Sequence, residues 1–269
     1  MPNLKTPILI LYLLKLAVIG LITVLAACVI IIIGLFDPYG KRVYGIGRFW
    51  AWTVLRVSGV SLKVNGLSHI DPNRQYVFMS NHQSNLDIPV LIHSLAVFQL
   101  RWIAKKELLW IPFFGWAMWA AKHITVDRSD RSEAIGVLKK AKRSMAGGIS
   151  LVVFPEGTRS TTERLLPFKR GGLLLAVKAK APIVAVTING SGKLLPKGSW
   201  RVRRGEIEVT VGEPISLENY RAGALRALSA QVYEAIAKNL SPQINAGTDL
   251  SERAQQFVTA QSSLNARTQ

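Results

Sequence analysis

The feature that most constrains this chain is an uncharged apolar run from Leu16 to Phe36. As a helix that rises about 1.5 Å per residue, a run of this length crosses a hydrocarbon core of about 30 Å. A cleaved signal peptide would have a shorter apolar core followed by a cleavage site between small residues. This run instead ends in isoleucines and is followed by Asp37 and Pro38. We therefore expect a helix that stays in the membrane.

The distribution of charge indicates which side of the membrane the rest of the chain occupies. The net charge is +18, and a protein this basic binds nucleic acid, an anionic membrane surface or acidic small molecules. The apolar content of 49% favours the membrane, so we expect no nucleic-acid partner. Basic residues are more numerous after the apolar run than before it, and such segments tend to stay in the cytoplasm. The predicted location is the inner (cytoplasmic) membrane, with the later part of the chain facing the cytoplasm.

A second apolar stretch, from Tyr44 to Val60, has two interpretations. Arg48, Trp52 and Arg56 are four residues apart and so share one face of a helix. Such a face suits a helix that lies in the membrane interface or returns through one leaflet. The first core helix of a soluble domain would explain the same stretch. We therefore expect either a membrane helix or a helical hairpin at the N-terminus.

From Ser61 onward, short β-rich runs alternate with helical runs, which is typical of an α/β domain with a largely parallel sheet flanked by helices. The expected strands are 61–65, 75–79, 100–104, 123–126, 150–154, 183–188 and 207–211. The expected helices are 87–94, 131–146, 171–178 and 217–240. After Ser241 the chain turns polar. These patterns divide the chain into membrane-anchoring helices at 1–60, an α/β domain at 61–240 and a polar tail at 241–269.

The first candidate site follows the strand expected at 75–79. In an α/β sheet, ligands bind beyond the carboxyl ends of the strands. This strand leads directly into His82, with Asp87 five residues later at the start of a helix. An aspartate that accepts a hydrogen bond from one ring nitrogen fixes the histidine tautomer and leaves the other nitrogen to remove a proton from a hydroxyl. The alternative is that Asp87 only caps the helix and His82 is an ordinary loop residue.

The second candidate site is the loop from Phe154 to Ser160, which follows the strand expected at 150–154. It contains a glycine turn, an arginine and two hydroxyl side chains. Arginine forms two-pronged contacts with phosphate, and hydroxyls and backbone amides supply further hydrogen bonds. The loop therefore fits a phosphate-binding site, although an ordinary solvated turn explains the same residues.

Taken together, the two segments resemble the glycerolipid acyltransferase family, and within it the 1-acylglycerol-3-phosphate acyltransferases. The family's four blocks resemble Asn81 to Asp87, which holds a histidine-x4-aspartate motif, Ile124 to Arg128, Phe154 to Ser160, which matches in full, and Ala181 to Val186. The resemblance covers roughly residues 60–220. One departure is Lys122, where glycine is common in the family.

The resemblance implies a reaction and a role for each candidate residue. A fatty acyl group would pass from an acyl thioester to the sn-2 hydroxyl of 1-acyl-glycerol-3-phosphate, giving phosphatidate. His82 would be the general base, and Asp87 would orient it. Hydrogen-bond donors must stabilise the oxyanion, and the sequence does not identify them. The residues expected to position the acceptor and its phosphate are Lys105, Arg128, Glu156, Gly157, Thr158 and Arg159.

The same resemblance implies the partners of the reaction. The acyl donor would be acyl-coenzyme A (acyl-CoA) or an acidic acyl carrier protein, with no bound cofactor and no metal. The acceptor would be lysophosphatidate in membrane lipid. The basic residues at 139–143 are usually a solvated helix face, but they could also dock anionic lipid or a carrier protein. Four tryptophans could line an acyl channel or anchor the domain at the headgroup layer: Trp102, Trp110, Trp116 and Trp119.

Three other functions fit parts of the sequence. The same chemistry could act on another lysolipid, because Arg159 favours a phosphate monoester without requiring one. A hydrolase of thioesters or lipids would need a Gly-x-Ser-x-Gly nucleophile elbow, which the sequence lacks. A non-enzymatic protein that binds anionic lipid would explain the charge, but it would leave His82, Asp87 and the third block unexplained.

Overall fold

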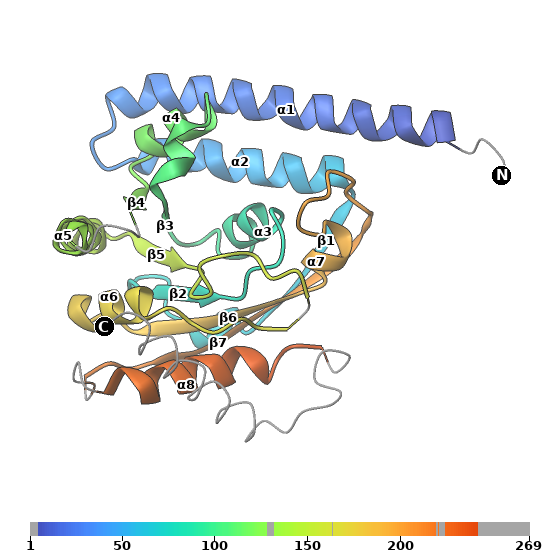
Figure 1. The fold of residues 1–269 in the computed structure, drawn as a ribbon. Coiled ribbons are helices and arrows are strands. Elements are labelled where there is room, and N and C mark those ends of the chain that lie inside the picture. Colours follow the sequence, from blue (N-terminus) through green and yellow to red (C-terminus); the bar gives the residue numbers. More distant parts are fainter. Residues whose placement is uncertain (1–4, 128–131, 163, 219, 221–223, 242–269) are drawn as a thin grey trace.

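The computed structural model describes residues 5–127, 132–162, 164–218, 220 and 224–241. These residues form a seven-stranded sheet with helices on both faces and two long N-terminal helices along one side (Figure 1). Arg128 lies outside the described residues, as does the tail expected at 241–269 apart from Ser241.

The expected strands are all present. They are β1 (Val60–Asn65), β2 (Val77–Ser80), β3 (Leu100–Lys105), β4 (Ile124–Val126), β5 (Ser150–Val153), β6 (Ile183–Asn189) and β7 (Gly205–Ile215). Their order is β1-β7-β6-β2-β5-β3-β4, and each neighbouring pair is parallel except β6 with β7. The prediction of an α/β fold with a largely parallel sheet is therefore confirmed.

The antiparallel pairing of β6 with β7 keeps the connection between them at one edge of the sheet. Asn189 at the end of β6 lies opposite Glu208 near the start of β7. The intervening segment 190–204 contains the short helix α7 (Ser191–Leu194). Because β6 runs parallel to β2, this connection lies at the same edge as the residues that follow β2.

The helices beyond the N-terminal pair agree with the sequence pattern in part. The structure contains η1 (Leu67–His69), α3 (Asp87–Ser94), η2 (Lys106–Trp110), α4 (Phe114–Ala120), α5 (Glu133–Ala146), α6 (Arg170–Ala179) and α8 (Leu225–Ala237). The helix expected at 87–94 is present with the same bounds, whereas the one expected at 217–240 was too long. Leu217 precedes α8 and is buried in the core instead. Helix α4 was not predicted.

Each face of the sheet has its own apolar core, because neighbouring residues of a strand point to opposite faces. Phe78 of β2 packs with α2 (Lys41–Ser58) and α3 on one face. Val77 and Met79 pack with α5, α6 and α8 on the other face. Strands covered on both faces are apolar throughout, which is why β2, β5 and β6 are buried along their whole length.

The N-terminal pair consists of α1 (Lys5–Leu35) and α2, which lie side by side (Figure 1). The segment Leu9–Leu35 of α1 is long and apolar enough to cross a membrane. Asp37 precedes α2 and satisfies its first turn, because its carboxylate accepts hydrogen bonds from the N–H groups of Arg42 (2.6 Å) and Val43 (3.3 Å). Across the pair, Trp50 Nε1 donates to Thr23 Oγ1 at 3.0 Å.

The second N-terminal helix has features of both interpretations of 44–60. Tyr44, Ala51 and Leu55 are buried in the core beside α3, as expected for a core helix. Arg48, Trp52 and Arg56 lie on the exposed face, where an interfacial helix would present them. The division of the chain at residue 60 stays a prediction.

Candidate active site

The loop after β2 is fixed to the neighbouring strand before it reaches the histidine. Asn81 Nδ2 donates to the carbonyl of Ile188 in β6, and Asn81 Oδ1 accepts from the N–H of the same residue, both at 2.8 Å. The side chain of Asn81 thus completes the hydrogen bonding of β6 where the backbone of β2 has ended. His82 therefore follows a rigid point of the sheet.

Asp87 holds the histidine from the start of α3. Its fully buried Oδ2 accepts hydrogen bonds from His82 Nδ1 at 2.7 Å and from the N–H groups of Gln83 and Ser84 at 2.8 Å each. Because the carboxylate accepts, Nδ1 carries the proton of the neutral imidazole, and Nε2 is left as an acceptor. Asp87 therefore organises the loop before α3 and sets the histidine tautomer, and among the described residues it makes no cap hydrogen bond to the helix. Its catalytic role stays a prediction.

The loop after β5 packs directly on this pair. The ring of Phe154 stacks on the ring of His82, with centroids 3.9 Å apart and planes at 8°. Gly157 has a φ of +72°, which glycine adopts without strain, and its N–H closes a turn onto the carbonyl of Phe154 at 3.0 Å. This turn directs the side chain of Glu156 inward, where it is 2% exposed.

Glu156 makes two hydrogen bonds to the backbone. Oε1 accepts from the N–H of His82 at 2.7 Å, and Oε2 accepts from the N–H of Leu166 at 2.9 Å. Burial raises the pKa of Glu156 to about 7, against the lowering effect of these two hydrogen bonds. An acid buried beside a histidine–aspartate pair is a common mark of a functional site.

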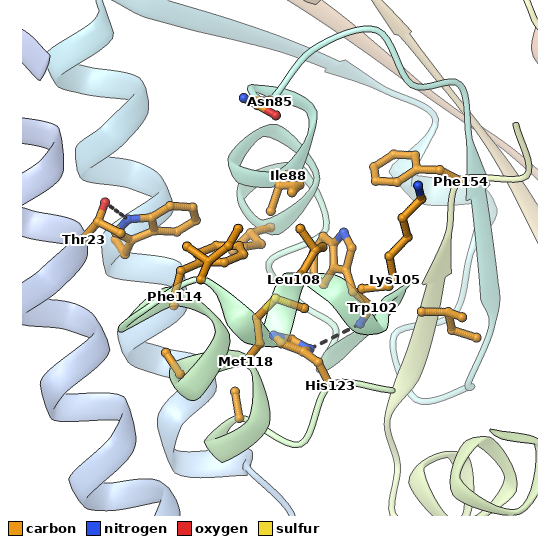
Figure 2. Close-up of a pocket in the computed structure, with 18 of the residues that line it drawn as sticks. Thr23, Asn85, Ile88, Trp102, Lys105, Leu108, Phe114, Met118, His123 and Phe154 are labelled. Carbon is orange, nitrogen blue, oxygen red and sulfur yellow. Dashed lines mark hydrogen bonds between the residues drawn. The ribbon is translucent and has the colours of Figure 1, made fainter. Parts of the chain in front are cut away.

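A cavity of about 640 Å³ extends from the strand ends to the N-terminal helices. His82, Lys105, Gly157, Thr158 and Arg159 line it at the strand ends. Figure 2 shows Lys105 and Phe154 on this side, and Thr23 and Phe114 on the opposite side. The remaining lining is mainly apolar side chains of α1, α2, α3, β3, η2 and α4. The volume is within the usual range of small-molecule sites, about 300–1,000 Å³.

The structure brings most of the predicted site residues together. His82, Lys105, Gly157, Thr158 and Arg159 share the cavity, with Asp87 and Glu156 buried behind His82. Among the described residues, no group of three histidine, cysteine, aspartate or glutamate side chains has the arrangement of a metal site. The backbone carbonyl of Arg159 also accepts a hydrogen bond from Lys197 Nζ at 2.9 Å, so the β6–β7 connection contacts the same loop.

The inner wall of the cavity contains residues that sequence reasoning missed. Thr23, Trp50, Phe114, Met118 and His123 come from α1, α2 and the region around α4. The only signal for them was the cluster of tryptophans, which divides in the structure. Trp102 is buried and lines the cavity, whereas Trp110, Trp116 and Trp119 are exposed. The set therefore divides between one cavity-lining position and three exposed positions, and both functional explanations stay predictions.

The site thus combines a histidine whose Nδ1 is bound to a carboxylate, an apolar cavity and two cationic side chains, Lys105 and Arg159. The sequence model of the acyltransferase family matches residues 61–189, a segment that contains both candidate loops. This is the class to which the fold and the site belong.

Individual relatives narrow the class. A 1-acyl-sn-glycerol-3-phosphate acyltransferase of Limnanthes douglasii is 33% identical over 223 residues, which is 82% of this chain and 78% of that protein. One from Pseudomonas aeruginosa is 32% identical over 72% of this chain and 74% of its own length. The crystal structure of the 1-acyl-sn-glycerophosphate (LPA) acyltransferase PlsC from Thermotoga maritima matches with a TM-score of 0.73 and 25% identity, over 90% of this chain and 97% of that one. The chain belongs to the 1-acyl-sn-glycerol-3-phosphate acyltransferase family, and the resemblance of the sequence blocks is confirmed.

Proposed function

We propose that this enzyme transfers a fatty acyl group from an acyl thioester to the sn-2 hydroxyl of 1-acyl-glycerol-3-phosphate, giving phosphatidate. The observation that carries the proposal is the position of His82. Its Nδ1 is bound to Asp87 at 2.7 Å, and its ring lines an apolar cavity beside Lys105 and Arg159. The names of the relatives support the same acceptor.

The reaction follows from the tautomer of His82. Nε2 removes the proton of the sn-2 hydroxyl as its oxygen attacks the thioester carbonyl, and a tetrahedral oxyanion forms. Asp87 stabilises the imidazolium that results. When the intermediate collapses, the carbon–sulfur bond breaks and the sulfur leaves as a thiolate. The proton on Nε2 passes to this thiolate, which restores His82 and releases phosphatidate and a free thiol.

Arg159 and Lys105 are the proposed holders of the acceptor phosphate. Arg159 lies in the loop after β5, Lys105 is the last residue of the neighbouring strand β3, and both line the cavity beside His82. The guanidinium of Arg159 presents a planar fork to a phosphate, and Lys105 adds a compact charge. Thr158 and the backbone of Gly157 complete this side of the cavity. Arg128, outside the described residues, remains a proposed helper.

The apolar part of the cavity is the proposed site of an acyl chain. Its walls are formed by Ala27, Ile88, Trp102, Phe114 and Met118, together with their neighbours. The donor would be acyl-CoA or an acyl carrier protein. The exposed basic residues Lys139, Lys140, Lys142 and Arg143 of α5 offer a surface for an acidic carrier protein or anionic lipid.

The protein associates with a membrane through its N-terminus, and we propose the cytoplasmic membrane with the active site on the cytoplasmic side. Large apolar side chains are exposed on α1, α2, η2 and α4 and at Phe36, including Phe49, Trp52, Trp110 and Trp119. Tryptophans of this kind favour the headgroup layer. Since α1 also lines the cavity, the site would lie next to the lipid that supplies the acceptor.

The test is an assay of the purified protein with several lysolipids, each offered with acyl-CoA and with acyl carrier protein. Thiol release and lipid product are followed together. We expect phosphatidate from lysophosphatidate, and loss of product with His82→Ala at unchanged binding to anionic vesicles. Product from another lysolipid alone would contradict the proposed acceptor. Normal turnover by a folded His82→Ala variant would contradict the mechanism, and vesicle binding without any product would indicate a lipid-binding protein.

A further inference from the structure

The peptide of His82 is held from both sides by the loop after β5. Its N–H donates to Glu156 Oε1 at 2.7 Å, and its carbonyl accepts from the N–H of Ser160 at 2.8 Å. The ring is held separately, by Asp87 at Nδ1 and by Phe154 on its face. The backbone and the ring of the proposed base therefore have independent supports.

Glu156 also fixes the loop from which it projects. Its second oxygen accepts from the N–H of Leu166 at 2.9 Å, which ties the segment after Ser160 to the same carboxylate. Ser160 Oγ in turn contacts the carbonyls of Thr162 (2.6 Å) and Arg164 (2.9 Å), which closes that segment on itself. The buried carboxylate of Glu156 thus joins the loop that contains His82 to the segment that contains Leu166, within the long connection that follows β5.

The position of Glu156 argues against contact with the acceptor. The side chain is 2% exposed and is absent from the cavity lining, whereas its neighbours Gly157, Thr158 and Arg159 line the cavity. Both of its oxygens are engaged by backbone N–H groups. A glutamine would keep the size of the side chain, but only its oxygen accepts, so its NH2 group would face one of the two N–H donors.

We propose that Glu156 is a positioning residue, which holds the peptide of His82 and leaves acceptor binding to the neighbouring side chains. This inference deepens the proposed acyl transfer and rests on it. It differs from the role expected from the sequence, in which Glu156 positions the acceptor. Misplacement of a reacting group by about 1 Å costs on the order of 10²-fold in rate, so loss of this support should act on turnover.

The experiment compares Glu156→Gln, Glu156→Asp and the wild-type enzyme, with Glu208→Gln as the matched control. Glu208 lies on β7, where it pairs with Lys63 at 3.1 Å and does not line the cavity. The kinetic constants kcat and KM are measured for lysophosphatidate and for acyl-CoA. We expect Glu156→Gln to lower kcat by about 10- to 100-fold, with KM for lysophosphatidate within about twofold of wild type. Glu156→Asp keeps the charge but is shorter, so its kcat should lie between those of the wild type and Glu156→Gln. The kcat of Glu208→Gln should match that of the wild type.

Two results would overturn the inference. One is a large rise in KM for lysophosphatidate at unchanged kcat, which would make Glu156 an acceptor ligand. The other is wild-type kcat in a folded Glu156→Gln protein. If Glu156→Gln does not fold, Glu156→Asp supplies the same comparison of kcat with KM.

A second measurement does not depend on the substrate. The backbone N–H of His82 should exchange slowly with deuterium in the wild-type enzyme and faster in Glu156→Asp, and rapid exchange in the wild type would contradict the proposed support. Inactivity of the wild type and Glu208→Gln on lysophosphatidate would instead count against the proposed function, while the exchange result would still decide the role of Glu156.

Discussion

Two histidines line the same cavity, one at the strand ends and one in the inner wall, and their surroundings give them opposite properties. His82 donates from Nδ1 to a carboxylate, which leaves Nε2 as an acceptor. His123 accepts at Nδ1 from the N–H of Trp102 at 3.3 Å, so the proton of its neutral ring is on Nε2. Burial, and then the charge of Arg101, lowers the pKa of His123 to about 3. The partner of Nδ1, and not the presence of a histidine in a cavity, decides which of the two is suited to act as a base.

The largest loss of activity is expected at His82, the histidine that the comparison predicts to act as a base. His82→Asn retains a polar group near the position of Nδ1 and removes Nε2. We expect kcat to fall by a factor on the order of 10² to 10⁴, the usual contribution of a positioned general base. Steady-state kinetics with lysophosphatidate and acyl-CoA measure the effect. Equal losses of kcat from His82→Asn and His123→Asn would abolish the distinction between the two regions.

The next effect concerns the partner that sets the tautomer of His82. Asp87→Asn keeps the shape of the side chain but removes its charge, so the proton on Nδ1 is no longer fixed. We expect kcat to fall by on the order of 10- to 10³-fold while lysophosphatidate binding is retained. Vesicle-based binding and turnover are measured on the same preparation. A loss of binding that equals the loss of turnover would indicate a purely structural role, through the N–H groups of Gln83 and Ser84.

Arg159 tests whether the strand-end side of the cavity holds the phosphate. Arg159→Lys keeps the charge and loses the planar fork. We expect KM for lysophosphatidate to rise by about tenfold with little change in KM for acyl-CoA. Arg226→Lys, at an exposed position of α8, is the control. Equal rises in both KM values would argue that Arg159 supports the fold.

The buried acid beside His82 predicts a pH-dependent stability. The pKa of Glu156 is about 7 in the folded protein, above its ordinary value, so the folded state binds the proton more tightly than the unfolded state. The contribution of Glu156 to stability is then greatest at acid pH and falls as pH rises through 7, by on the order of 3 kcal/mol relative to Glu156→Gln. Thermal unfolding of both proteins from pH 5 to pH 8 measures this difference. Parallel curves would show that Glu156 is ionised without cost.

The smallest effect on activity is expected in the inner wall. His123→Asn places an oxygen near Nδ1 to accept from Trp102, so kcat should change little. The lowered pKa of His123 means that the wild type loses stability as pH falls below about 6.5, because the unfolded chain takes up a proton that the folded one does not. His123→Asn should lack this loss. The same loss of stability at acid pH in the wild type and in His123→Asn would contradict the lowered pKa of His123.

The parts that sequence predicts well in this protein are those determined by local pattern. Strands buried on both faces are continuous apolar runs, and His82 and Asp87 are five residues apart, so their pairing follows from one strand and one helix. The cavity could not be predicted from local pattern, because Thr23, Trp50 and Met118 meet only through the packing of α1, α2 and α4. Helix α4 has seven residues and follows Phe113, which has a φ of +60°. The helix is therefore too short for the sequence to show a helical apolar periodicity. The sequence predicts Glu156 as a site residue, but its two backbone partners depend on the turn at Gly157.

The antiparallel return of β6 into β7 has a consequence for how such an enzyme can diversify. A parallel crossover would have carried the chain over a face of the sheet to its other edge. Here the segment 190–204 leaves and re-enters at the edge that holds His82, and it contacts the site through Lys197 and through Leu195, whose carbonyl accepts from Ser84 Oγ at 2.8 Å. A hairpin connection tolerates insertions and deletions without disturbing the strands that it joins. Insertions or deletions in this segment would therefore act beside His82 and Arg159, while the paired strands β6 and β7 stay as they are.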